Sequence, residues 1–204
     1  MVEAVIEAPP ATLVKLNIGS GPNKMPGYIS VDVLPFDGKV DVVVNLAKDK
    51  WPWEDSSVDE IHCSHFLEHL TNFNDKWERV HFFNEVYRVL KPWTSAATDA
   101  NGPKATLIFP HWCSNRFYGD PTHKEPFSEM GFAYIDKDWR AANAPHVDSR
   151  TAPGPQAYSC DFSYSYGTSL HPAIIPRNAE YQQHALTFFK EASQDIIATI
   201  KARK

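Results

Sequence analysis

The chain has few cysteines, no long apolar run and no basic start. Its three cysteines, Cys63, Cys113 and Cys160, include no CxxC pair, which argues against a disulfide scaffold and a cysteine-type zinc site. No apolar run approaches the ~18 residues that a membrane span needs. Residues 1–12 carry two Glu and no Lys or Arg, unlike the basic start of a secretory signal. We therefore expect a soluble, cytoplasmic protein without a membrane partner.

An excess of basic charge is also missing. The 204 residues carry 20 Lys and Arg against 25 Asp and Glu, a formal net charge of −5. A net negative chain has no overall positive potential that would attract a polyanion, so nucleic acid is disfavoured as a partner. The 43% apolar content is enough for the core of one globular domain.

Short apolar segments separated by turn residues dominate the first half of the chain. They predict strands at residues 13–18, 28–33, 40–45, 58–63 and 105–110. The valine run at 40–45 is typical of a strand buried on both faces. Apolar residues at helical spacing predict one long helix over residues 74–90, which Asn74 caps and Pro92 ends. The pattern indicates an α/β fold, a Rossmann-like and mostly parallel sheet flanked by helices.

The connections after the first and third predicted strands are short. Residues 19–27 and 46–57 leave little room for a crossover helix, which normally needs a dozen or more residues. Residues 94–104 are polar and contain Gly and Pro, which predicts a loop. We therefore expect trimmed crossovers.

The second half is predicted to elaborate this core. Residues 136–158 show no periodicity, which favours a loop that covers a site, and residues 160–168 alternate like a late strand. From residue 179 the spacing of Leu186, Phe189, Ile196 and Ile200 predicts a C-terminal amphipathic helix. We expect one domain over 1–204, with a cofactor-binding core at 13–110, acceptor-pocket loops and the late strand at 111–178, and the helix at 179–204.

A glycine bend followed by an acid is the most informative local feature. Gly19 and Gly21 follow the first predicted strand, and Asp32 ends the second. Glycines let a backbone approach a ligand closely, and ligands of open parallel sheets bind at the carboxyl ends of strands. A simple tight turn is the alternative. Dinucleotide binding fits poorly, because Lys24 replaces the third glycine and Asp32 follows Gly21 by only 11 residues instead of ~20.

Several motifs in order carry a resemblance to a known family. Residues 16–21 (LNIGSG), 26–32 (PGYISVD), 51–61 (WPWEDSSVDEI), 64–70 (SHFLEHL) and 85–92 (EVYRVLKP) resemble motifs of class I S-adenosylmethionine-dependent methyltransferases, nearest the type-11-like subgroup. The resemblance covers about residues 13–110, and residues 120–123 and 126–128 resemble a segment of some of these enzymes. The chain departs from the family pattern after Pro92, where Trp93 replaces a glycine, and at Asn45, where Asp is common.

The resemblance implies S-adenosylmethionine as cofactor and a set of contacts to it. These fall at the methionine part (Gly19, Ser20, Gly21), the ribose diol (Asp32), the adenine faces (Val33, Leu34), the base edge (Asn45, Leu46) and the floor beneath the cofactor (Ser64, His65). Transfer to a small molecule or sugar, at oxygen, is the expected reaction, and a general base helps when the acceptor is a hydroxyl.

Candidate catalytic residues follow the fifth predicted strand. His111 comes directly after it, and His123 lies in an aromatic loop with Asp120 as its expected orienting partner. For this reaction no metal ligand is assigned, and the oligomeric state is left open.

Two other functions stay as alternatives. His65, Glu68 and His69 form the H-x-x-E-H pattern of inverted zincins, which would indicate a zinc-dependent hydrolase. The predicted strand at 58–63 argues against it, since His65 would then lie at a strand end. The altered segment after Pro92 motivates the second alternative, a catalytically inactive nucleotide-binding module.

Overall fold

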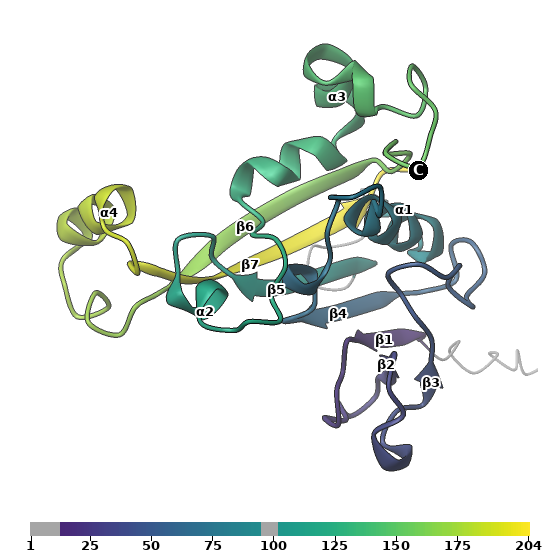
Figure 1. The fold of residues 1–204 in the computed structure, drawn as a ribbon, viewed down its shortest axis with the longest axis horizontal. Helices are drawn as coiled ribbons and strands as arrows, with labels where there is room; N and C mark the ends of the chain where they lie inside the picture. The colour runs from purple at the N-terminus through teal and green to yellow at the C-terminus, as the bar shows by residue number, and fades with distance from the viewer. Residues whose placement is uncertain (1–12, 95–101) are drawn as a thin grey trace, which may run out of the picture.

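Seven strands form one sheet in the computed structural model, which describes residues 13–94 and 102–204 (Figure 1). The strands are β1 (Lys15–Ile18), β2 (Ile29–Asp32), β3 (Val42–Val43), β4 (Glu60–Ser64), β5 (Lys104–Pro110), β6 (Phe162–Leu170) and β7 (Ser193–Ala202). The α-helices are α1 (Glu78–Val89), α2 (Asn115–Tyr118), α3 (Lys137–Asn143) and α4 (Ala179–Phe188). Short 3-10 turns are η1 (Phe36–Gly38), η2 (Leu67–His69), η3 (Glu129–Ile135) and η4 (Pro145–Val147).

The sheet is mostly parallel. Its strand order is β3-β2-β1-β4-β5-β7-β6; β1 to β5 run parallel, and β7 lies antiparallel between β5 and β6. The chain leaves β1 toward β2 on one side and returns to β4 on the other, so the strand order reverses between β1 and β4. The carboxyl ends of strands beside such a reversal are where open α/β sheets bind ligands. The predicted Rossmann-like α/β fold is confirmed.

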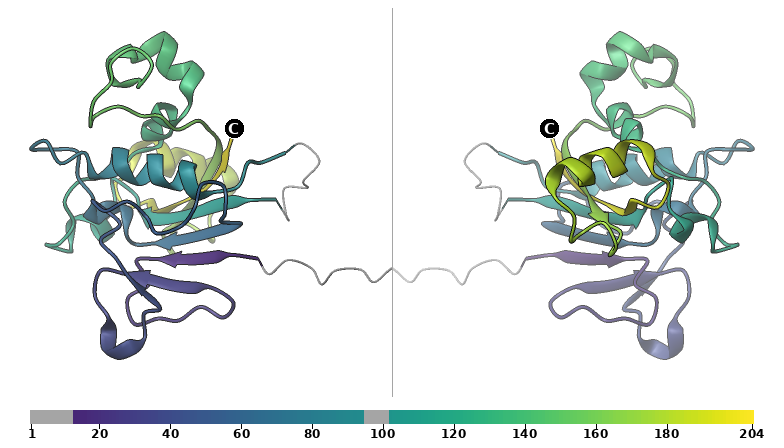
Figure 2. Two further views of the ribbon diagram at one scale, coloured as in Figure 1. Left: turned by 90° about the vertical axis from the view of Figure 1, so that its right-hand side faces the viewer. Right: turned by 90° about the vertical axis from the view of Figure 1, so that its left-hand side faces the viewer.

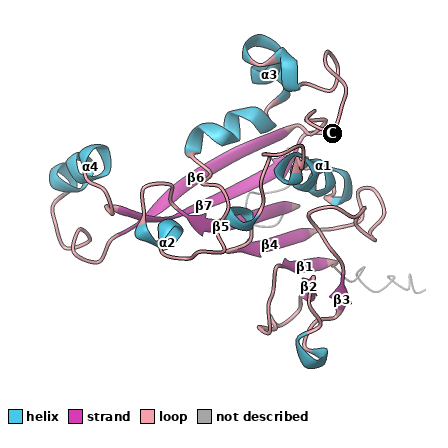
Figure 3. Cartoon of the chain, in the orientation of Figure 1, coloured by secondary structure: helices cyan, strands magenta, loops and turns pink. Residues whose placement is uncertain are grey.

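The crossovers are trimmed as predicted. Residues 19–28 and 46–57, all of them described, form turns and bends without a helix, and Figure 3 shows loop between β1 and β2. The one long crossover helix, α1, lies along one face of the sheet (Figure 2). On that face the ring of Tyr87 from α1 lies 5.4 Å from the ring of Phe162 in β6.

Burial alternates along the strands. Ile61, Leu107 and Ala198 are fully buried on the face toward α1, while their neighbours in sequence are partly exposed. The valine run departs from its prediction. Only Val42–Val43 forms a strand, and Val43 is 53% exposed, because β3 is the edge strand of the sheet.

Helix α1 begins later than predicted. Asn74 has a φ of 55° and lies outside the helix. The Asn72 side chain takes over the expected role: its Oδ1 accepts the N–H groups of Arg79 and Val80 at 3.1 and 3.4 Å. The helix ends at Val89, close to the predicted stop.

The predicted C-terminal helix over 179–204 is wrong in its second half. Helix α4 ends at Phe188, and Ser193–Ala202 forms β7 in the middle of the sheet. A spacing of four residues, as between Ile196 and Ile200, fits both the helical period and an alternation of two. Burial of Ile196, Ala198 and Ile200 shows that the period of two applies.

The predicted loop over residues 136–158 is also wrong in part. It contains α3 and η4, and the Asp136 side chain caps α3 by accepting the N–H groups of Asp138 and Trp139, both at 2.9 Å. Residues 1–12 and part of the predicted loop at 94–104 lie outside the described residues. Within residues 13–94 and 102–204, no helix has the length and apolar character that crossing a membrane demands.

Candidate active site at the carboxyl edge of the sheet

The glycine bend is tied to the acid that ends β2. Gly19 and Gly21 adopt positive φ angles of 63° and 53°. The Asp32 carboxylate accepts the Gly21 N–H on Oδ2 at 2.9 Å and the Leu34 N–H on Oδ1 at 3.1 Å. One carboxylate therefore fixes the bend after β1 to the turn after β2.

The two glycines differ in what surrounds them. A Cβ added to Gly19 would lie 2.8 Å from a ring carbon of Phe66, whereas nothing lies within 4 Å of one added to Gly21. Gly19 thus has a packing role as well as a conformational one.

This difference predicts unequal losses of stability. We expect Gly21→Ala to lower the free energy of unfolding by about 1–2 kcal/mol, the cost of a left-handed conformation for a residue with a Cβ. Gly19→Ala should cost about 1–2 kcal/mol more, because Phe66 must also move. Urea unfolding of both variants measures the difference, and equal losses would show that Phe66 yields freely.

A cavity of about 220 Å³ opens beside Asp32 at the carboxyl edge of β2 and β4. Four of the sequence-predicted cofactor residues line it: Asp32, Val33, Asn45 and Leu46. Val33 and Leu34 are more than half exposed, which is unusual for adjacent large apolar side chains unless something covers them. Polar and apolar groups therefore converge at the place where the sequence predicts a nucleoside.

The other predicted cofactor positions do not line this cavity. Ser20 is buried, and its N–H donates to the carbonyl of Val31 at 3.2 Å. Ser64 ends β4. His65 follows with a φ of 55°, and its N–H donates to the carbonyl of Ile108 at 2.8 Å. The structure does not place Ser64 or His65 in the cavity lining.

Several residues of this region were not predicted from the sequence. Buried Asn17 in β1 donates from Nδ2 to the carbonyl of Asn23 at 3.2 Å, which holds the glycine bend from below. Phe66, His69 and an ion pair between Glu78 and Lys124, 3.2 Å long, also line the cavity. A polar residue inside an apolar strand was the one available signal for Asn17; the others depend on tertiary contacts.

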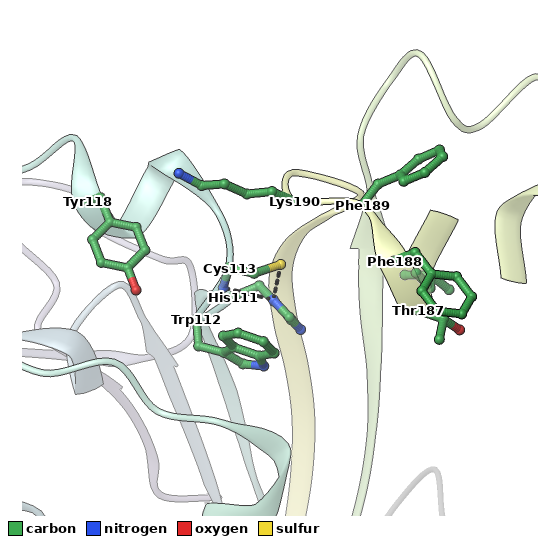
Figure 4. Close-up of a pocket in the computed structure, with 9 residues that line it drawn as sticks. His111, Trp112, Cys113, Tyr118, Thr187, Phe188, Phe189 and Lys190 are labelled. Atoms are coloured by element: carbon green, nitrogen blue, oxygen red, sulfur yellow. Dashed lines mark hydrogen bonds between the residues drawn. The ribbon is translucent and has the colours of Figure 1, made fainter. Parts of the chain in front are cut away.

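A second cavity, of about 390 Å³, lies beyond the end of β5 (Figure 4). Its lining residues come from the segment after β5 and from the end of α4: His111, Trp112, Cys113, Tyr118, Leu186, Thr187, Phe188, Phe189 and Lys190. Apolar walls with a few polar groups suit a small organic ligand.

His111 is held at both ring nitrogens. Nε2 lies 2.7 Å from Oε1 of Glu129, and Nδ1 accepts the Cys113 N–H at 3.2 Å. The hydrogen bond from His111 holds the pKa of Glu129 below its ordinary value. A ring engaged on both sides is better suited to shaping a wall than to accepting a proton.

His123 belongs to a different group of side chains from His111. Its Nδ1 lies 2.8 Å from the carbonyl oxygen of Phe117. Its Nε2 lies 3.8 Å from Glu68 Oε1 and 3.8 Å from Asp120 Oδ2. The expected proximity of Asp120 and His123 is present, although Oδ1 of Asp120 is occupied by Thr122, from which it accepts the N–H and the hydroxyl.

The inverted-zincin arrangement is absent. His65 follows a strand, and η2 spans only Leu67–His69. His65 and His69 therefore do not lie one turn apart on a continuous helix, which that zinc-hydrolase motif requires.

Comparison with known proteins finds a family model that matches part of the chain. Residues 27–96 match the family model described as "Methyltransferase domain". The match covers about a third of the 204 residues and supports an S-adenosylmethionine-dependent methyltransferase. The resemblance to the class I, type-11-like subgroup is thereby confirmed.

Solved methyltransferase structures share the fold. An S-adenosylmethionine-dependent methyltransferase from Archaeoglobus fulgidus is 17% identical, with a TM-score of 0.57 over 94% of this chain and 86% of that one. One from Mesorhizobium loti is 10% identical, with a TM-score of 0.52 over 93% and 90%. A complex of the Trm112 activator and a methyltransferase from Haloferax volcanii gives 12% identity and a TM-score of 0.50 over 95% and 84%. No curated protein matches this chain.

Proposed function

We propose that this methyltransferase transfers a methyl group from S-adenosylmethionine to a hydroxyl oxygen of a small molecule or sugar in the cytoplasm, without a nucleic-acid partner. The observation that carries the proposal is the cavity at the carboxyl edge, where the Asp32 carboxylate, Asn45 and Leu46 converge. It lies beside the glycine bend, and a second cavity of suitable size lies at the end of β5 along the same edge.

The residues around the first cavity fit an adenosyl group. Asp32 uses two hydrogen-bond positions for backbone N–H groups, and a carboxylate offers about four, so positions remain for both ribose hydroxyls. Val33 and Leu34 would cover the adenine, with Asn45 near the base edge. The open space at Gly21, with Gly19 and Ser20 beside it, suits the methionine part. The remaining predicted positions, Ser64 and His65, would lie below the cofactor at the end of β4.

The bound cofactor supplies a methyl group that its sulfonium already activates, so the protein must chiefly align donor and acceptor. In this proposal Trp112, Tyr118 and Phe189 form apolar walls of the acceptor cavity. His111, fixed by Glu129, shapes that cavity.

We assign His123, with Asp120 beside it, to the acceptor hydroxyl. Helix α2 links His123 to the acceptor cavity. The carbonyl oxygen of Phe117 lies 2.8 Å from Nδ1 of His123, and the neighbouring Tyr118 lines the cavity. The three catalytic candidates from the sequence thus have two roles in this proposal. His111 lines the acceptor cavity, and the pair of His123 and Asp120 acts on the acceptor hydroxyl.

Calorimetric titration and a product assay test the proposal. We expect S-adenosylmethionine and its demethylated product to bind with one site per chain, and a panel of phenols, polyols and sugars to include an O-methylated product. Absence of cofactor binding would overturn the proposal entirely. Binding without turnover across the panel would favour the inactive module, and methylation at nitrogen or carbon would overturn the assignment to oxygen.

A further inference from the structure

We propose that Glu68, His69 and His123 form a binding site for a divalent transition-metal ion. One ligand atom from each lies within 4.8 Å of the others, the only such group of three found within residues 13–94 and 102–204. Turn η2 presents Glu68 and His69 in succession, and the loop after α2 brings His123 against them. The zinc-hydrolase alternative from the sequence named Glu68 and His69 together with His65, but not His123, because the grouping with His123 depends on tertiary structure.

The hydrogen bonds of the two histidines orient both rings for coordination. Nδ1 of His123 lies 2.8 Å from the carbonyl oxygen of Phe117, and Nδ1 of His69 lies 3.3 Å from that of Thr122. A carbonyl oxygen only accepts, so each Nδ1 carries the hydrogen and each Nε2 keeps its lone pair. A backbone carbonyl that fixes the tautomer in this way is typical of metal-binding histidines.

Glu68 supplies an independent indication. Its side chain is 2% exposed, yet Oε2 has no hydrogen-bond partner within the described part of the chain. Oε1 faces His65 Nδ1 at 3.2 Å and His123 Nε2 at 3.8 Å. A buried carboxylate oxygen without a partner is costly, and a cation bound by both oxygens of the Glu68 carboxylate would satisfy it.

The donor set selects the kind of metal. Two imidazole nitrogens and one carboxylate suit Zn²⁺, Co²⁺, Mn²⁺ or Fe²⁺ better than Ca²⁺ or Mg²⁺, which prefer oxygen alone. Tetrahedral bonds of about 2.1 Å separate ligand atoms by about 3.4 Å, so ligand atoms that lie up to 4.8 Å apart need to approach by up to about 1.4 Å. Three protein ligands leave a coordination position open, as in catalytic sites.

The position of the site suggests its role, and this step rests on the proposed function. His69 also lines the cofactor cavity, so the metal would lie between that cavity and α2. A metal there lowers the pKa of a hydroxyl that occupies its open position. With the metal bound, His123 acts on the acceptor hydroxyl as a metal ligand and not as a proton acceptor. The hydroxyl releases its proton to solvent, its oxygen forms a bond to the methyl carbon, and the carbon–sulfur bond breaks with its electrons going to sulfur.

Direct metal titration tests the site without the methyl-transfer reaction. Protein freed of metal by a chelator, and then freed of the chelator, is titrated calorimetrically with Zn²⁺, Co²⁺ and Mn²⁺. We expect one ion per chain for at least one metal, and Co²⁺ should give the visible absorption of a nitrogen- and oxygen-ligated centre. His123→Ala and Glu68→Gln should each weaken binding by about tenfold or more. His146→Ala, at an exposed histidine of η4, is the matched control and should leave the Kd unchanged.

The possible failures can be told apart. Circular dichroism and thermal unfolding without metal check that each variant is folded, and Glu68→Gln keeps the shape of the side chain. Absence of metal binding in the wild type, or an unchanged Kd in both folded ligand variants, would overturn the site. Methyl transfer that survives chelation would overturn the metal's role but leave the proposed function intact. Loss on chelation and recovery with added metal would support the role. Failure to bind S-adenosylmethionine would instead overturn the proposed function while the metal titration still stood.

Discussion

Replacing Asp32 by alanine is expected to raise the Kd for S-adenosylmethionine about five- to 150-fold, which corresponds to about 1–3 kcal/mol. The variant loses a charged acceptor for the ribose hydroxyls. It also loses the carboxylate that accepts the N–H groups of Gly21 and Leu34, so both sides of the proposed adenosyl site become less well fixed. Isothermal titration calorimetry of wild type and variant measures the change.

Asp41 offers a matched control for this measurement. Its carboxylate also accepts a backbone N–H at the β2 strand, that of Ser30 at 2.9 Å, but it pairs with Lys24 and does not line the cavity. Asp41→Ala should therefore leave the Kd for the cofactor unchanged while removing a comparable backbone contact. An unchanged Kd in a folded Asp32→Ala variant would remove Asp32 from the proposed site.

The sequence was sufficient where local chemistry decides the structure. The glycine bend after β1 requires positive φ angles at Gly19 and Gly21, which few other residues adopt readily. Asp32 was placed at the end of its strand from the same short segment. The trimmed crossovers followed from chain length alone, since 10 or so residues cannot hold both a helix and its two turns.

The sequence was insufficient where tertiary contacts decide between two local possibilities. Ile196 and Ile200 satisfy both helical and strand periods, and pairing with β5 and β6 selected the strand. Asn72 and Asn74 are both good capping residues, and the fold uses Asn72. The grouping of His123 with Glu68 has no local signal at all, because the two residues come from loops far apart in the chain.

The buried arginine of α3 carries the largest expected effect on stability. Arg140 is 1% exposed and donates to the carbonyls of Tyr134 and Cys160 at 2.7 and 2.6 Å, and to Asp148 at 3.3 Å. We expect Arg140→Ala to lower the free energy of unfolding by about 3–5 kcal/mol, because it leaves two carbonyls without their buried donor and removes one of the two arginines that bind the buried Asp148 carboxylate. Urea unfolding followed by tryptophan fluorescence measures the loss.

Arg150 separates the effect of burial from that of charge. It also binds Asp148, at 2.7 Å, but its side chain is half exposed. Its hydrogen bond, with the charge of Arg140, holds the pKa of Asp148 well below the ordinary value, so the carboxylate stays ionised near neutral pH in either variant. Arg150→Ala should cost only about 1 kcal/mol, since solvent replaces an exposed partner. Equal losses would show that the attraction to Asp148, common to both arginines, dominates over the buried carbonyl contacts. A larger loss for Arg140→Ala would mean that these contacts hold α3 and η3 in place, and with η3 the Glu129 carboxylate against His111.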